Sequence, residues 1–365
     1  MTASRTRPVI GIALEPFGWH PAAFAEVGAD PLTATSAEHW VGLARSAEAA
    51  AADFVSFEDS FTLTARDRLS GRFDATLLAA RVAPSTTRIG LVPTVTATHT
   101  EPFHASKAIA TLDYVSKGRA GVLPATTGRQ ADAELFGRKP TQDSASQAAE
   151  ALEYVRVLRD LWDSWDDDAV IRDVETGRFV DRERLHYIDF RGEYFDVKGP
   201  SITPRPPQGQ PVVLARVNDL ASESVAAVAD IAIVPGGTDE QIVAVATRLR
   251  AAGVTRILGD VTVFLADSER TAARRIEKLD RREELADDAL VFAGTGAELA
   301  LLVERWQRLG LDGVRLRPGV NAVDLPRLRD TFAPLLAGRP ATGTFPDLLG
   351  LSRPAGRFAK AGGAQ

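Results

Sequence analysis

Short apolar runs alternate with longer amphipathic stretches along most of the chain. Val9–Leu14 reads VIGIAL and Phe54–Phe57 reads FVSF, and each run is followed by polar residues or Pro. Such runs are typical of strands buried on both faces. The stretches between them, such as Ser36–Ala52, repeat apolar residues at helical spacing, which predicts helices with one buried face. The pattern therefore predicts alternating strands and helices.

The expected elements can be placed from these runs. The strands are expected at Val9–Leu14, Phe54–Phe57, Arg88–Pro93, Arg119–Pro124, Pro211–Ala215, Ile231–Val234, Val261–Leu265 and Gly313–Leu316. The helices are expected at Ser36–Ala52, Ala75–Val82, Phe103–Tyr114, Ser144–Trp162, Leu220–Val228, Asp239–Ala252, Ser268–Asp287, Gly296–Leu309 and Leu325–Leu336. Eight parallel strands joined by right-handed helical crossovers close into a barrel. The predicted fold class is therefore α/β, a single (β/α)8 TIM barrel domain over residues 1–365.

Two segments depart from this alternation. An insertion of about residues 163–210 precedes the fifth expected strand and is rich in charge, Gly and Pro, and a C-terminal tail covers about residues 338–365. A long excursion in a compact domain is usually functional or disordered. Alternating polar and aromatic side chains in the insertion suggest an ordered hairpin: Tyr187, Asp189, Phe190, Glu193, Tyr194 and Phe195. We expect the insertion to close over the active site.

Charge and composition exclude several classes of function. The 43 basic and 49 acidic residues give a formal net charge of −6, which argues against a nucleic-acid or anionic-membrane partner. The chain has no cysteine, which excludes disulfides, thiolate metal sites and cysteine nucleophiles. It also has no GxGxxG, Walker, HExxH or GxSxG motif. Dinucleotide-fold, nucleotide-hydrolysing, zinc-protease and serine-hydrolase functions therefore lack support.

Two further expectations follow from the charged and apolar runs. The acidic run Asp163, Asp166, Asp167 and Asp168 has no histidine or fixed ligand spacing beside it, so solvated surface charge is favoured over a metal, and no metal is expected. The N-terminal segment lacks the long apolar region of a signal peptide, and no run of membrane-spanning length follows it. We therefore expect a cytoplasmic protein.

Several separated motifs carry a resemblance to a known family. They are Gly18-Trp19-His20-Pro21, the strand Asp53–Asp59, the segment Thr94–Gly137 with Glu101-Pro102-Phe103-His104 inside it, and Ser116-Lys117-Gly118-Arg119. In this order and at this spacing, the chain resembles the luciferase-like flavin monooxygenases. The most similar group acts on nitrilotriacetate, long-chain alkanes and dibenzothiophene sulfone.

The resemblance implies a function as well as a fold. It implies a flavin-dependent oxidoreductase that takes reduced FMN from a separate flavin reductase and combines it with dioxygen. The flavin hydroperoxide would then oxygenate a small organic substrate, and a homo-oligomer is expected. Two alternatives remain, namely a deazaflavin-dependent hydride transferase and a barrel that has lost flavin chemistry and only binds a ligand.

Candidate cofactor contacts lie where the expected strands end, because barrel active sites form at the C-terminal ends of the strands. Asp59 ends the second expected strand, Thr94 ends the third, and Thr126 and Thr127 follow the fourth. All four could reach a flavin at the barrel mouth, and the resemblance supports that role. The alternative for the threonines is helix capping or turn hydrogen bonding.

The resemblance places the flavin phosphate at the turn after the fifth strand. Arg216, Asn218 and Ser222 are the candidate contacts there, at the start of an expected helix whose dipole favours an anion. The alternative is that Asn218 or Asp219 caps the helix while Arg216 pairs with a carboxylate.

The chain departs from the family pattern at three flavin contacts. Val122-Leu123 replaces a Trp-Asn pair, and Gln142 and Ser146 replace a His and a Tyr early in the fourth helix. Gln142 and Ser146 can still form hydrogen bonds with a flavin, whereas Leu123 cannot. The sequence therefore leaves three alternatives for the cofactor: it is bound loosely, it is bound differently, or it is not bound at all.

His20 is the candidate catalytic residue, because it lies in the loop after the first strand. An imidazole that titrates near neutral pH suits proton transfer to or from substrate or peroxide. The alternative is a structural hydrogen bond only. His99, which follows the third strand, is the second candidate. The remaining histidines are expected to be structural: His39, His104 and His186.

Overall fold

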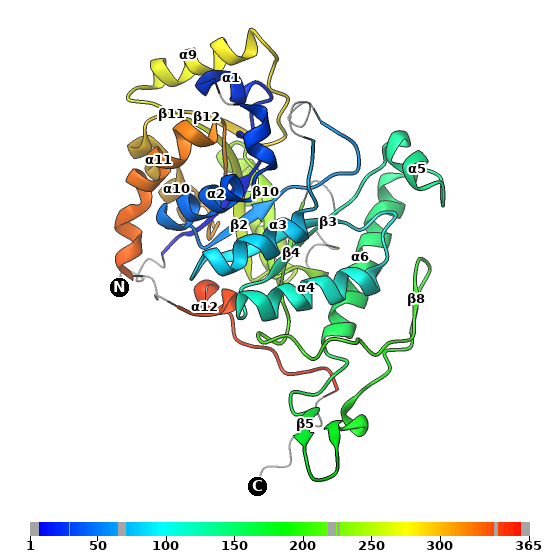
Figure 1. Ribbon diagram of the computed structural model, residues 1–365. Coiled ribbons are helices and arrows are strands. Elements are labelled where there is room, and N and C mark those ends of the chain that lie inside the picture. Colours follow the sequence, from blue (N-terminus) through cyan, green and yellow to red (C-terminus); the bar gives the residue numbers. More distant parts are fainter. Residues whose placement is uncertain are drawn as a thin grey trace.

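The computed structural model describes residues 7–28, 30–64, 71–217, 224, 227–338 and 342–358. Within them, parallel strands close into an eight-stranded barrel (Figure 1). The barrel strands, in spatial order, are β1 (Val9–Leu14), β2 (Phe54–Phe57), β3 (Gly90–Thr96), β4 (Gly121–Ala125), β9 (Val212–Arg216), β10 (Ile231–Pro235), β11 (Arg256–Leu265) and β13 (Gly313–Pro318). The pairing of β13 with β1 closes the ring. The predicted (β/α)8 barrel is confirmed.

Helices surround the barrel and pack their apolar faces on it (Figure 1). They are α2 (Ala37–Ala49), α3 (Ala75–Val82), α4 (Pro102–Ser116), α6 (Ser144–Trp162), α8 (Asp239–Ala251), α9 (Glu269–Asp280), α10 (Gly296–Arg308) and α11 (Asn321–Phe332). Short helices α1 (Ala23–Val27), α5 (Gln130–Phe136) and α12 (Phe345–Leu349) lie in the connections. Thr238 and Thr295 begin α8 and α10 with capping boxes, which satisfy exposed backbone N–H groups. The predicted helix Leu220–Val228 lies largely outside the described residues.

Two expected elements are corrected. The seventh strand was expected at Val261–Leu265, but β11 begins at Arg256 and pairs with β10 through its first half and with an additional strand, β12 (Leu290–Gly294), through its second half. Gly259 interrupts the apolar run, because a side chain there would clash with Trp306. The helix expected to reach Asp287 ends at Asp280, where the Asp280 carboxylate accepts from the Leu285 N–H at 3.1 Å.

An apolar plug closes the N-terminal end of the barrel. Phe345 of α12 is fully buried and contacts Phe54 of β2, with ring centroids 5.7 Å apart. Side chains at Gly90 and Gly121, on β3 and β4, would collide with the Phe345 ring, so both glycines make room for it. The lumen above the plug is filled by apolar side chains of the strands. In the part of the chain that the structure describes, the barrel is therefore open to ligands at its C-terminal end, here called the mouth.

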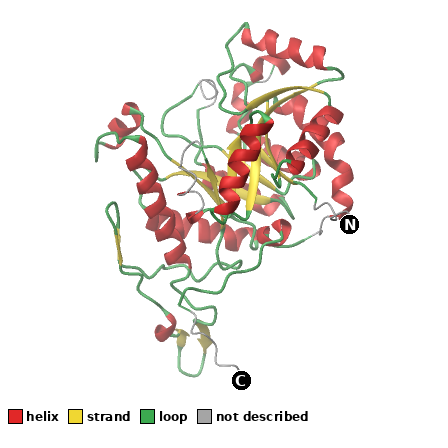
Figure 2. Cartoon of the chain, turned by 180° about the vertical axis from the view of Figure 1, so that it is seen from behind, coloured by secondary structure: helices red, strands yellow, loops and turns green. Residues whose placement is uncertain are grey.

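The insertion does not roof the mouth as expected. Its first hairpin, β5 (Val170–Asp173) with β6 (Arg178–Val180), lies at the closed end beside the C-terminal tail (Figures 1 and 2). Only the second hairpin, β7 (Phe190–Arg191) with β8 (Asp196–Val197), lies along α6. The lid expectation is thus wrong for the first hairpin.

Ion pairs explain where the first hairpin lies. Arg205 is buried and donates to Asp163 at 2.9 Å and to Asp167 at 3.1 Å, and its carbonyl accepts from the Tyr114 hydroxyl at the end of α4. Arg353 of the tail also pairs with Asp167. The acidic run is therefore an anchor for arginines rather than merely solvated charge.

We expect Phe345→Ala to destabilise the barrel strongly. Removal of a fully buried phenylalanine costs about 3–5 kcal/mol, because the surrounding atoms lose contacts and cannot fill the space. Urea unfolding followed by circular dichroism measures this change. Phe179→Ala, on the exposed strand β6, is the matched control and should change the free energy of unfolding little. Equal effects of the two substitutions would contradict a plug at α12.

Candidate active site at the barrel mouth

A layer of buried charges crosses the barrel above the apolar lumen. We define this ionic layer by Glu58, Arg216, Asp260, Arg315 and Arg317. Arg315 has no exposed side-chain surface and donates to Glu58 at 2.9 Å and to both oxygens of Asp260 at 3.0 and 2.8 Å. Arg216 donates to the other oxygen of Glu58 at 2.9 Å. The pairs join β13 to β11, and β2 to β9 across the lumen.

The ionic layer continues into the loop before β12 and the loop after β1. Arg317 pairs with Asp260, with Asp287 at 2.6 Å and with Asp288 at 2.5 Å. Its guanidinium also lies 4.5 Å from the centre of the Trp19 ring, within the range of a cation–π contact. Each of these carboxylates at the floor of the mouth therefore has an arginine partner.

These arginines determine the ionisation of the buried carboxylates. Burial alone would raise the pKa of Glu58, but the charges of Arg315, Arg216 and Arg317 outweigh it and hold that pKa at about 2. The pKa of Asp260 is lowered for the same reason. Both groups are charged at neutral pH.

Arg216 is found in the alternative role considered for it. Its guanidinium pairs with Glu58, as expected for an arginine matched to a carboxylate. Asn218 and Ser222, the other two phosphate candidates, lie outside the described residues. Phosphate binding by these three residues stays a prediction.

Two predicted flavin contacts are buried polar groups without a protein partner. Thr94, on β3, is 2% exposed, and its hydroxyl has no hydrogen-bond partner among the described residues. The same holds for the side-chain oxygen of Gln142, just before α6. Because buried polar atoms are almost always hydrogen-bonded, both atoms fit a site whose ligand completes them. Thr94 and Gln142 therefore suit the polar edge of a flavin.

Most of the other predicted flavin contacts lie at positions that form hydrogen bonds within the protein. Asp59 accepts from the N–H of Ala75, the first residue of α3, at 2.9 Å, while Asp74 caps that helix. The Thr127 hydroxyl donates to Asp132, near the start of α5, and Ser146 N bonds to the capping Asp143 at 2.8 Å. Thr126 is partly exposed at the end of β4. The Thr127 hydroxyl also accepts from Arg129 N at 3.3 Å, so the alternative of turn hydrogen bonding is observed for Thr127. Flavin contacts of these four residues stay predictions.

His20 is fully buried and has a partner at each ring nitrogen. Nδ1 accepts from Ala22 N at 3.0 Å, so a neutral ring carries its proton on Nε2 and donates it to Asp280 at 3.0 Å. Phe264 packs against the ring edge. This is the structural alternative, and a catalytic role of His20 stays a prediction.

His99, the second candidate, lies at the mouth in an unusual environment. Its backbone is left-handed, with φ of 72°, which is uncommon outside glycine and often marks a functional site. Its ring stacks on Phe136 at 5.4 Å, and Nδ1 is buried without a partner among the described residues. Burial, helped by Lys139, lowers the pKa of His99. The ring is therefore neutral at pH 7.

Sequence reasoning missed the ionic layer and the surroundings of His99. Arg315 and Arg317 alternate within an otherwise apolar strand, as do Ser56 and Glu58 at the end of β2, and this alternation was the available signal. Phe136 and Glu150 gave no local signal, because their contacts with the mouth come from tertiary packing.

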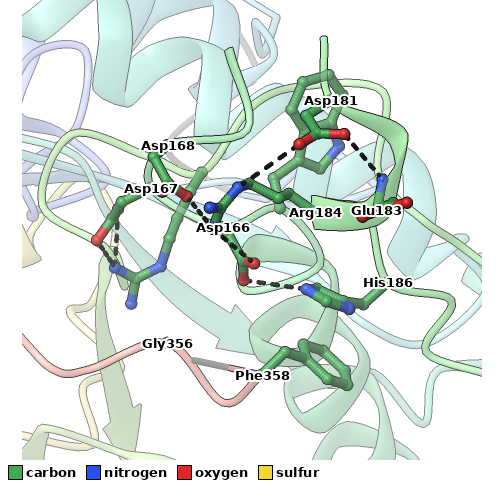
Figure 3. Close-up of a pocket in the computed structure, with 11 residues that line it drawn as sticks. Asp166, Asp167, Asp168, Asp181, Glu183, Arg184, His186, Gly356 and Phe358 are labelled. Carbon is green, nitrogen blue, oxygen red and sulfur yellow. Dashed lines mark hydrogen bonds and ion pairs between the residues drawn. The ribbon is translucent and has the colours of Figure 1, made fainter. Parts of the chain in front are cut away.

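Two cavities accompany the mouth and the insertion. One, of about 390 Å³, adjoins His99 and α6. The other, of about 420 Å³, lies between the first hairpin and the tail (Figure 3). In it, His186 pairs with Asp166 at 3.0 Å and stacks on Phe358 of the tail. Within the described ranges, no helix is long and apolar enough to cross a membrane.

Comparisons with known proteins agree with this architecture. The model of the luciferase-like monooxygenase family matches residues 19–313. The N-acetyl-S-(2-succino)cysteine monooxygenase of Bacillus subtilis is 33% identical over 59% of this chain and 49% of its own length. The nitrilotriacetate monooxygenase component A of Aminobacter aminovorans is 31% identical over 56% of this chain and 48% of its own length. The chain thus spans about half the length of these curated relatives.

A solved structure extends the likeness over nearly the whole chain. The EDTA monooxygenase from Chelativorans sp. BNC1 superposes with a TM-score of 0.80, covering 95% of this chain and 99% of its own. Its sequence is 21% identical, so this likeness shows a shared fold.

The ionic layer predicts a pH-dependent stability. Folding lowers the pKa of Glu58 from 4.5 to about 2. The ionised group therefore stabilises the fold at pH values above 4.5, and this stabilisation is lost as the pH falls from 4.5 toward about 2. Glu58→Gln should therefore cost about 3 kcal/mol at pH 7, and its deficit relative to the wild type should shrink as pH falls below about 4.5.

Urea unfolding of both proteins from pH 7 to pH 3 measures this deficit. Glu134→Gln, an exposed residue of α5, is the control and should follow the wild type throughout. A Glu58→Gln deficit that stays constant or widens on acidification would show that Glu58 is not held ionised by the arginines.

Proposed function

Because the chain belongs to the luciferase-like monooxygenase family, we propose that it is a flavin-dependent monooxygenase of a small organic substrate. The cofactor would be reduced FMN from a separate reductase, reacting with dioxygen through a flavin hydroperoxide. One relative is named component A of its monooxygenase, which supports a separate partner component. The observation that carries the proposal is the pair of unpartnered buried atoms, on Thr94 and Gln142, at positions expected to contact flavin.

The residues of the mouth would bind and orient the cofactor. The Thr94 hydroxyl can donate or accept, and the Gln142 oxygen accepts, so together they can bind a ring edge that carries both donors and acceptors. The phosphate would lie at the turn 216–222. When bound, the flavin supplies the oxygen chemistry, while the chain holds it and excludes water.

The ionic layer would form the floor of this site. The Glu58–Arg216 pair reaches from β2 to β9, two strands separated by β3 and β4, and so closes the lumen below the mouth. Each carboxylate of the ionic layer already pairs with an arginine, so neither Glu58 nor Asp260 is left unpaired for a ligand.

One feature, the side chain of Leu123, supports the two alternative functions. Leu123 is fully buried on β4, paired in register with Thr94, so an apolar side chain replaces a polar flavin contact beside it. This favours either a different cofactor, such as a deazaflavin used for hydride transfer, or a barrel that binds a ligand without flavin. Absorbance spectra of the protein titrated with reduced FMN and with reduced deazaflavin distinguish the three functions.

We expect Thr94→Val to weaken FMN binding by about five- to tenfold, because one hydrogen bond of about 1 kcal/mol is lost. The same change should leave the stability of the cofactor-free protein unchanged or raise it, since it removes a buried hydroxyl without a partner. Calorimetry with FMN and thermal unfolding without it measure both effects.

Thr111→Val is the control for Thr94→Val, because Thr111 lies on the exposed face of α4. Unchanged FMN affinity in Thr94→Val, or equal losses in both variants, would remove Thr94 from the cofactor site. If the wild type binds neither FMN nor the deazaflavin, the ligand-only barrel becomes the better proposal.

The role of His20 can be decided by separating turnover from stability. If His20 carries a proton during oxygen transfer, His20→Ala should lower turnover by about a hundredfold and leave FMN affinity nearly intact. If it only joins the β1 loop to α9, His20→Ala and Asp280→Ala should both lower the unfolding temperature and leave turnover of the folded fraction unchanged.

A further inference from the structure

One of the two cavities described above lies beside the loop that follows β3. It has a volume of about 390 Å³ and lies between the loop after β3, the loop before α6, α6 itself and the β7–β8 hairpin. We call it the hairpin pocket, defined by His99, Glu101, Arg138, Lys139, Glu150 and Tyr194. The hairpin that forms its outer wall runs beside α6 in both views (Figures 1 and 2).

The wall of the hairpin pocket is firmly held. The Glu153 carboxylate of α6 accepts from Glu193 N and from Tyr194 N, both at 2.9 Å, and thereby binds the hairpin turn. A side chain at Gly192 would collide with this carboxylate, so the turn approaches α6 closely. Phe195 packs edge-on against Tyr154, with ring centroids 5.8 Å apart. The pocket is therefore a structured site.

The cations that line the pocket already have carboxylate partners. Lys139 forms an ion pair with Glu150, and Arg138 pairs with Glu101 at 3.3 Å. The acidic residue of the hairpin wall, Asp196, pairs with Arg191 at 3.1 Å. An anionic ligand would have to break one of these pairs to be bound, which makes carboxylate ligands a poor match.

Two hydrogen-bond acceptors in the pocket lack partners. Glu150 is 2% exposed, and its Oε2 has no partner among the described residues, although Oε1 binds Lys139. His99 is 7% exposed, and its Nδ1 is likewise unpartnered. A buried acceptor left unsatisfied costs about 1–3 kcal/mol, more when it is charged. A ligand with donor groups would recover this cost.

The ring of His99 is in the right ionisation state for such a ligand. The lowered pKa of His99 keeps its ring neutral, so Nδ1 can accept a hydrogen bond. The left-handed backbone of His99 and the stacking on Phe136 fix the ring at the edge of the pocket. The aromatic side chain of Tyr194 supplies a further surface that favours a cation.

We propose that the hairpin pocket binds a small protonated amine, which donates hydrogen bonds to Glu150 Oε2 and His99 Nδ1. An ammonium group matches a carboxylate oxygen that still lacks a partner, and its remaining protons can reach the imidazole. That the bound amine is the substrate of the oxygenation rests on the proposed function. That the hairpin pocket binds an amine does not.

The test uses two probes of the same carbon-chain length and opposite charge, putrescine and succinate, without flavin. We expect calorimetry to detect putrescine binding to the wild-type protein and no comparable binding of succinate. Glu150→Gln should weaken putrescine binding by at least about tenfold, because the charge of the acceptor is lost. Glu134→Gln, on the exposed face of α5, should bind putrescine like the wild type.

A second measurement keeps the test decisive if Glu150→Gln folds poorly. In protein labelled with ¹⁵N-histidine, putrescine should shift the Nδ1 resonance of His99, which is assigned by its loss in His99→Asn. No putrescine binding, equal binding in Glu150→Gln, preference for succinate, or an unmoved His99 resonance each overturns the proposal. Because these measurements are made without flavin, they test amine binding even if the protein does not bind FMN.

Discussion

The buried guanidinium of Arg315 is the group on which the interior of the barrel depends. A charge without solvent exposure is tolerated only when it is paired and fully hydrogen-bonded. Arg315 meets this requirement by binding Glu58, Ser56 and Asp260, which belong to two other strands. These contacts join the interior of β11 and β13 to the C-terminal end of β2.

The same requirement divides the lumen into two parts. Below the ionic layer, apolar side chains and the Phe345 plug leave no polar partner for a ligand. Above it, strand ends and loops present polar atoms. A cofactor is thus confined to the mouth by the chemistry of the interior, and the depth at which it can bind is set by the Glu58–Arg216 pair.

The sequence predicted the barrel well because its strands are continuous apolar runs, a local signal. The predicted bounds of β1 and β2 are the observed ones. The predicted strand at β11 begins too late, because Gly259 interrupts the apolar run, and the need for glycine there comes from Trp306, which is distant in the sequence. The position of the first hairpin was wrong, since Arg205 holds it through partners far away in the sequence. The candidate site residues were predicted less well, because Thr and Asp can form hydrogen bonds either within the chain or with a ligand. Only the tertiary structure shows that Thr127 bonds within the chain and that Thr94 has no partner among the described residues.

One stretch of chain, from β3 to the first half of α6, contributes most of the unmet hydrogen-bonding capacity at the mouth. Thr94, His99, Gln142 and Glu150 all come from it, and each keeps a buried polar atom without a partner among the described residues. Burying such atoms is costly, so their retention on one side of the barrel is best explained by ligands that bind there. Thr94 and Gln142 are two of the predicted cofactor contacts, while His99 and Glu150 line the hairpin pocket. Since His99 lies in the loop after β3, the strand that carries Thr94, a ligand in the hairpin pocket would lie close to the proposed cofactor site.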